Sequence, residues 1–140
     1  MAHKMYFNPK GYTMKPFEPS KHLLDYNEMD STHQEFLDIY NSVDSSDAQS
    51  YRMKLMELLE HSKRHFAFEE NLMDTTEYKR SREHKDEHAK VLAEMEYFIK
   101  SSNSKLGLRM LQAYYKEKLP DWFDLHLISM DSDLAHHLKS

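Results

Sequence analysis

Histidines and acidic residues recur four positions apart in this chain, which has ten histidines and no cysteine. His65 precedes Glu69 by four positions, and His84 precedes His88 by the same spacing. Residues four apart on an α-helix lie about 40° apart around its axis, so each pair presents two donor groups to one side. Imidazole and carboxylate groups are common metal ligands. Helices with these spacings can therefore build a metal site.

The paired donors continue the apolar stripes of the helices that carry them. From His84 and His88, steps of three and four residues reach Val91 and Met95. An ionised carboxylate in a helical core costs several kcal/mol unless it is paired or bound to a metal. The predicted ligand set takes side chains from four apolar stripes: His33, His65, Glu69, His84, His88, His126 and Asp131.

A simpler interpretation holds for each donor alone. A single histidine on an apolar stripe is more often a core residue with one hydrogen bond, and a single pair is more often a surface pair. Five histidines and two carboxylates facing inward exceed what such hydrogen bonds satisfy. The remaining histidines are predicted to be solvated in the N-terminal arm and the C-terminal tail: His3, His22, His136 and His137. Two interpretations of His61 stay open. It is either a surface residue, or a residue that contacts the metal ligands from outside or lines a channel to them.

Seven ligands are more than one first-row metal ion needs. If Glu69 and Asp131 each bridge two ions, the chain supplies five nitrogens and four oxygens. A bridging oxide or hydroxide then leaves one of the twelve positions of two octahedral ions open to a small ligand. Mixed imidazole and carboxylate donors favour iron or manganese, whereas structural zinc favours tetrahedral Cys/His sites. No histidine has a glutamate three residues before it, unlike ferritin-like di-iron proteins. The histidine-rich set favours binding over oxidation catalysis.

The elements that position these residues are predicted to be helices. Two glycines and four prolines are too few for the turns of an all-β domain. Apolar periodicity and polar breaks predict four helices, at about residues 30–43, 48–73, 78–100 and 105–130. Pro120 is predicted to bend or divide the last one. The fold class is therefore all-α, an up-down-up-down four-helix bundle over residues 29–140, with an irregular N-terminal arm, residues 1–28, packing on it.

Composition excludes several partners. The net charge of −5 argues against nucleic acid and anionic membrane surfaces. No apolar run approaches the roughly 18–20 residues that span a bilayer, and the N-terminus lacks a signal-peptide pattern. We expect a cytoplasmic protein that binds neither nucleic acid nor membrane.

The pattern resembles the hemerythrin family, in its bacterial single-domain form. The match runs through residues 30–33, 65–73, 84–88 and 122–131, and every ligand position of the family motif is present in order and at the family's spacing. Three departures leave the ligands untouched. Phe123 stands where a smaller aliphatic residue is usual, Leu127 stands where isoleucine is usual, and Pro120 is atypical.

The resemblance implies two iron ions joined by a bridging oxo or hydroxo group. It assigns His84, His88 and His126 to one iron and His33 and His65 to the other, with Glu69 and Asp131 bridging. Dioxygen would bind reversibly at the two-histidine iron, in an apolar pocket formed by Phe66, Trp122, Phe123 and Leu127. We therefore expect oxygen storage, delivery or scavenging rather than an enzyme.

Two other functions stay open. One is a di-iron enzyme that handles peroxide or nitric oxide or repairs iron centres. The repair relatives are expected to carry an additional segment with cysteine, and this chain has no cysteine. The other is a sensor, which in this family is normally fused to a signalling domain.

Overall fold

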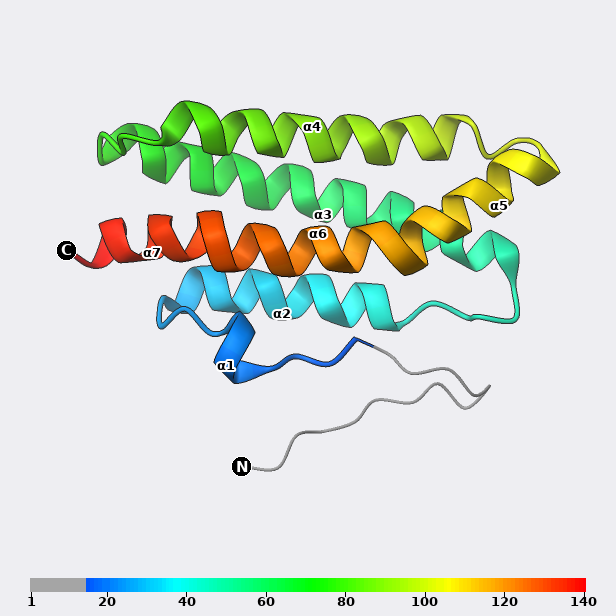
Figure 1. Cartoon of the computed structure of the whole chain (residues 1–140), viewed down its shortest axis with the longest axis horizontal. Coiled ribbons are helices and arrows are strands. Elements are labelled where there is room, and N and C mark those ends of the chain that lie inside the picture. The colour runs from blue at the N-terminus through cyan, green and yellow to red at the C-terminus, as the bar shows by residue number, and fades with distance from the viewer. Residues whose placement is uncertain (1–14) are drawn as a thin grey trace.

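The computed structural model describes residues 15–140, which form helices and no β-strand. A short helix, α1 (Pro19–His22), comes first. Three long helices follow: α2 (Asn27–Asn41), α3 (Ala48–Thr75) and α4 (Ser81–Lys100). A final helical stretch is made of α5 (Lys105–Ala113), α6 (Leu119–His126) and α7 (Ser132–Lys139). Two π-helical turns join the parts of this final stretch: η1 (Tyr114–Lys118) and η2 (Leu127–Asp131). Figure 1 shows α2, α3, α4 and the final stretch side by side, each running opposite to the one before. The predicted all-α class is confirmed.

The helix ends differ from the predicted ones for local reasons. The first long helix begins at Asn27 because the Asp30 carboxylate accepts two N–H groups from the segment that precedes the helix. The third predicted helix, α4, begins at Ser81 and not at residue 78. The Tyr78 N–H donates to the Met73 carbonyl and so closes the end of α3. The last helical stretch continues past residue 130 to the end of α7. No described helix is both long enough and apolar enough to cross a membrane.

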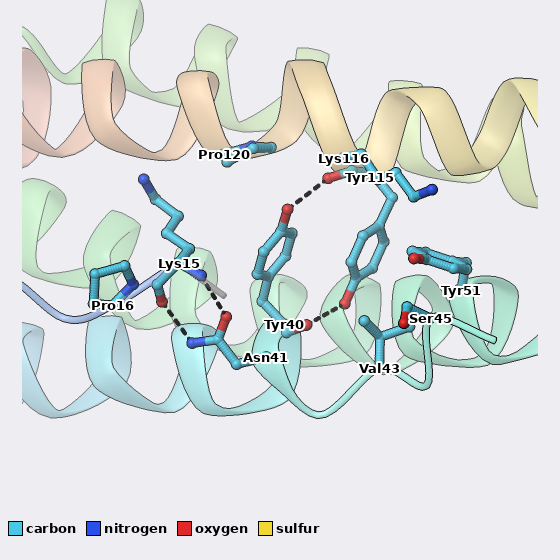
Figure 2. A pocket seen from close by; sticks show the side chains of 10 residues that line it. All are labelled: Lys15, Pro16, Tyr40, Asn41, Val43, Ser45, Tyr51, Tyr115, Lys116 and Pro120. Carbon is cyan, nitrogen blue, oxygen red and sulfur yellow. Dashed lines mark hydrogen bonds between the residues drawn. The ribbon is translucent and has the colours of Figure 1, made fainter. Parts of the chain in front are cut away.

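The last helical stretch is divided at Pro120, as predicted, because the π-helical turn η1 ends just before it and Pro120 lies in the first turn of α6. In η1 the Leu119 N–H donates to the carbonyl of Tyr114, five residues earlier. Pro120, five residues after Tyr115, has no N–H that could donate to the Tyr115 carbonyl in the same way. The hydroxyl of Tyr40 donates to the Tyr115 carbonyl instead, at 2.9 Å (Figure 2).

The same two tyrosines form a reciprocal contact between α2 and the last helical stretch. The Tyr115 hydroxyl donates to the Tyr40 carbonyl at 2.7 Å, in the last turn of α2, where carbonyls have no partner within the helix. The two rings stack with centroids 4.6 Å apart (Figure 2). This pair fixes the position of α2 against the helix that carries His126.

Two apolar clusters lie at different levels of the helices, and the predicted ligands fall between them. The smaller cluster contains Met29, Met73, Tyr78, Leu134 and Ala135. The larger cluster includes Phe36, Leu37, Leu55, Leu58, Phe66, Val91, Met95, Leu111 and Leu127. Along α2, α3 and the final stretch the ligands come between a residue of one cluster and a residue of the other, and the ligands of α4 come between Tyr78, just before that helix, and Val91. The polar centre is therefore closed at both ends by apolar packing.

The described part of the N-terminal arm packs against the helices, and residues 1–14, with His3, lie outside the described residues. Phe17 packs against the larger apolar cluster. The prediction that His22 is solvated is wrong, because its side chain is fully buried. Its Nδ1 accepts the Glu18 N–H, and its Nε2 donates to the Asp124 carboxylate at 2.8 Å. The Lys15 amine binds the same carboxylate at 2.7 Å. Asp124 thus anchors the arm to α6.

Replacing Asp124 with asparagine should lower the free energy of unfolding of the metal-free protein by about 1–2 kcal/mol at neutral pH. Burial raises the pKa of Asp124, but the bonds from His22 and Lys15 outweigh burial and lower the pKa to about 2. A carboxyl group with a lowered pKa stabilises the fold fully when the pH is above the ordinary pKa of the group. This stabilisation is lost as the pH falls towards 2. Urea unfolding should therefore show a gap between the two proteins that narrows from about pH 5 downwards. Asp121→Asn, at an exposed position of α6, is the control. Equal destabilisation by both variants would contradict the anchor.

Candidate metal centre

The seven predicted ligands converge on one buried site. All are at least nine-tenths buried, and Glu69 is fully buried. Their donor atoms fall into two groups that can each hold a metal ion, one of five side chains and one of four: Glu69, His84, His88, His126 and Asp131 in the first, and His33, His65, Glu69 and Asp131 in the second. Glu69 and Asp131 belong to both groups. The predicted convergence on one pocket is confirmed.

The oxygens of each carboxylate divide between the two groups. Oε2 of Glu69 lies 2.8 Å from His65 Nε2, whereas its Oε1 lies 3.1 Å from His88 Nε2. Oδ2 of Asp131 lies 2.9 Å from His33 Nε2, whereas its Oδ1 lies 3.0 Å from His84 Nε2. Oδ1 of Asp131 also lies 3.2 Å from His126 Nε2. Each carboxylate is therefore placed to bridge two cations, one at each oxygen.

These close approaches are not all hydrogen bonds. The Nε2 atoms of His84, His88 and His126, both oxygens of Glu69, and Oδ1 of Asp131 are buried without a hydrogen-bond partner among the described residues. Neighbouring ligands about 2.1 Å from an octahedral ion lie about 3.0 Å apart, against about 3.4 Å for a tetrahedral ion. The separations named above, 2.8–3.2 Å, are close to the octahedral value, whereas Nε2 of His84 and Oε1 of Glu69 lie 3.5 Å apart. Most of the donor separations therefore suit six-coordinate cations.

A π-helical turn brings Asp131 into the site. His126 and Asp131 are five residues apart, which on an α-helix would place them about 140° apart around the axis. In η2 the Ser132 N–H donates to the Leu127 carbonyl five residues earlier, so the turn is wider by one residue. Oδ1 of Asp131 consequently lies 3.2 Å from Nε2 of His126.

The charge of the centre is balanced by protons when metal is absent. Burial lowers the pKa of His84, but the carboxylates of Asp131 and Glu69 outweigh burial and raise the pKa to about 9. Burial and Asp131 both raise the pKa of Glu69, yet the nearby imidazoles of His65 and His84 bring it below its ordinary value. The carboxylates of Glu69 and Asp131 therefore stay ionised, and His84 holds a proton that binding of a cation would release.

Two histidines of the five-residue group are held from outside by partners that sequence spacing did not indicate. Nδ1 of His88 lies 3.0 Å from Oε2 of Glu70, and the Phe66 ring stacks on His88 with centroids 3.8 Å apart. Trp122 stacks on His126 at 4.7 Å. An outer carboxylate of this kind fixes the tautomer and orientation of a ligating imidazole.

A cavity of about 20 Å³ opens on the four-residue group. It accommodates one water-sized molecule. Three of the four predicted pocket residues line it, Phe66, Trp122 and Phe123, and Phe36, Thr32 and Ser62 complete the wall near His33 and His65. The shared ligand Asp131 and one imidazole of the five-residue group, His126, also border the cavity. Leu127 is buried in the larger apolar cluster and does not line the cavity.

The remaining histidines are placed as follows. His61 is buried, so its interpretation as a surface residue is wrong. Its Nε2 lies 3.2 Å from the Thr32 carbonyl, and burial lowers its pKa. His136 is exposed, as predicted, whereas His137 is half-buried with Nε2 3.1 Å from the Thr76 carbonyl. These partners lie far away along the chain, so no local pattern predicts them.

Comparisons of the chain with protein-family models, with curated proteins and with solved structures give no match. The chemistry of the centre is therefore inferred from its own donor atoms and cavity.

Proposed function

We propose that this chain is a hemerythrin-like, up-down-up-down four-helix bundle that holds two iron ions at the centre and binds dioxygen reversibly at one of them. The division of the carboxylate oxygens supports two ions rather than one. Two ferrous ions together supply the two electrons that dioxygen takes up on binding. Octahedral positions with nitrogen and oxygen donors suit iron better than zinc.

The observation that carries the proposal is the coincidence of the cavity with the less saturated metal position. Three histidines and two carboxylate oxygens face one position, but only His33 and His65 and the other two oxygens face the second. With one bridging oxygen shared by both ions, the first reaches six ligands and the second keeps one place open. The cavity lies against His33 and His65, so an incoming molecule meets the open place.

The side chains around the cavity favour a small apolar ligand. Phe36, Phe66, Trp122 and Phe123 form most of its wall, and they exclude bulk water from the ligand. A volume of about 20 Å³ admits a diatomic molecule and rejects an organic substrate. The hydroxyl of Thr32, a polar residue in the cavity wall, donates to the Met29 carbonyl at 2.9 Å. Binding is therefore favoured over catalysis on a larger substrate.

Metal analysis combined with an oxygenation spectrum tests this function. Protein expressed with ample iron should contain about two irons per chain, be nearly colourless when reduced, colour strongly in air and bleach when oxygen is removed. Far fewer than two irons would contradict the centre. Two irons with irreversible oxidation and release of hydrogen peroxide would instead support the di-iron enzyme or the sensor.

A further inference from the structure

A second recess reaches the centre next to His84 and has a different character from the aromatic cavity. It has a volume of about 150 Å³, and its walls include Tyr78 and Arg80 from the segment between α3 and α4, Glu83 from α4 and Asp133 from α7. The space is sufficient for a cation with part of its water shell. His84 itself forms the inner wall, so its ring separates the recess from Asp131.

Neither ring nitrogen of His84 has a hydrogen-bond partner among the described residues, and only one of the two faces the carboxylates of the centre. Its Nε2 lies 3.0 Å from Oδ1 of Asp131. Its Nδ1, on the other flank of the ring, is buried and has no hydrogen-bond partner among the described residues. The residue is only 2% exposed, so this nitrogen has lost water without a replacement inside the protein. A ligand in the recess is the group that can satisfy it.

The other two histidines of the five-residue group are restrained in ways that His84 is not. His88 is held by Glu70 at Nδ1 and is covered by the stacked ring of Phe66. His126 is covered by the stacked ring of Trp122. The ring contacts of His84 are edge-to-face ones with His88 and His126, at 4.5 and 4.9 Å between centroids. His84 can therefore turn without losing an outer hydrogen bond.

The charges around the recess favour a cation. Glu83 is exposed at its mouth, and Asp133 accepts a hydrogen bond from the Tyr78 hydroxyl. Arg80 is the opposing charge, at 3.9 Å from Asp133, and its side chain is 65% exposed. The aromatic cavity, in contrast, has a volume of only about 20 Å³ and a largely aromatic wall, so a cation that entered it would have to shed most of its water before it reached His33 and His65. A hydrated divalent cation meets a lower barrier through the recess.

We propose that the recess lined by Glu83, Asp133 and His84 is the port through which divalent cations enter the metal centre. Glu83 and Asp133 hold the hydrated ion by charge, and His84 is the first imidazole that replaces one of its waters. Turning of the His84 ring then passes the ion to the carboxylates of Asp131 and Glu69. This inference rests on the metal-binding part of the proposed function and not on oxygen binding.

The test is the rate at which the metal-free full-length chain takes up Co²⁺, followed without oxygen by the visible absorption of the bound ion at low salt. Glu83→Gln should slow uptake by about three- to tenfold, because one attracting charge is lost at the mouth. Arg80→Gln should speed uptake by a similar factor. Asp86→Asn, at an exposed position on the same helix outside the recess, should leave the rate unchanged. Salt at about 0.5 M should remove the differences.

The final amount of bound Co²⁺ separates this inference from the proposed function. Glu83→Gln should end with as much bound Co²⁺ as the unchanged chain, and only the rate should differ. Equal rates for Glu83→Gln and Asp86→Asn would overturn the port while leaving the centre intact. Failure of the unchanged chain to bind about two ions would overturn the centre itself. Oxygen binding is tested separately by the iron-loaded protein.

Discussion

Replacing Glu69 with glutamine should abolish the binding of both metal ions. Oε2 of Glu69 belongs to the His65 side of the centre and Oε1 to the His88 side, so one substitution removes an anionic ligand from each position. The glutamine amide nitrogen is not a ligand, and the neutral side chain no longer balances cationic charge. The variant should also lose the stabilisation that metal gives, about 4 kcal/mol at a thousandfold excess over Kd, or about 10 °C in Tm.

Elemental analysis and thermal unfolding with and without metal measure this effect. Glu70→Gln is the matched control, because Glu70 adjoins Glu69 but contacts only the outer nitrogen of His88. It should keep both ions and lose about 10- to 100-fold in affinity. One tightly held ion per chain in Glu69→Gln would show that this carboxylate does not bridge.

Helical periodicity alone predicts much of the centre. The pairs His65/Glu69 and His84/His88 keep the four-residue spacing on regular helices, and the structure brings each pair to the centre. These pairs were recognisable because their helices also carry a clear apolar stripe. The direction of each side chain follows from the helix, so little tertiary information is needed.

Asp131 shows where periodicity fails. Its five-residue distance from His126 does not fit an α-helix, and it reaches the centre through the π-helical turn η2. A π-turn depends on packing around the whole helix, and residue spacing gives no direct sign of it. Asp131 enters the predicted ligand set because it follows His126 at the end of the apolar stripe of the last helix, and the motif order of the resemblance includes it too.

The buried histidines outside the ligand set show a second limit. His22 lies in the N-terminal arm, where no apolar stripe is predicted, and His61 lies on α3 four residues before His65, so spacing alone does not decide whether either side chain is buried. Their burial depends on partners that are distant in sequence, the Asp124 carboxylate for His22 and the Thr32 carbonyl for His61. The outer contact of Glu70 with His88 is of the same kind. Such pairings become visible only after the helices are assembled.

Replacing His33 with alanine should abolish reversible oxygen binding while the helices stay folded. His33 is one of only two imidazoles in the four-residue group. After the substitution, that metal position keeps His65, Glu69 and Asp131 as its donors. The five-residue group does not include His33, so its ion should remain bound. Loss of a residue that only holds a metal ligand from outside costs about 10- to 100-fold in affinity. Loss of the ligand His33 itself should lower the oxygen affinity by about 100-fold or more.

The measurement combines metal content, circular dichroism and an oxygen titration of the reduced protein. His61→Gln is the control, because His61 is also buried and lies 6.2 Å from His65 between ring centroids, but it is in neither ligand group. It should keep both ions and still colour and bleach with oxygen. If His33→Ala bound oxygen with unchanged affinity, the open position would have to lie on the three-histidine side. The aromatic cavity would then face the wrong ion, because its wall includes both imidazoles of the four-residue group, His33 and His65, but only His126 of the three on the other side.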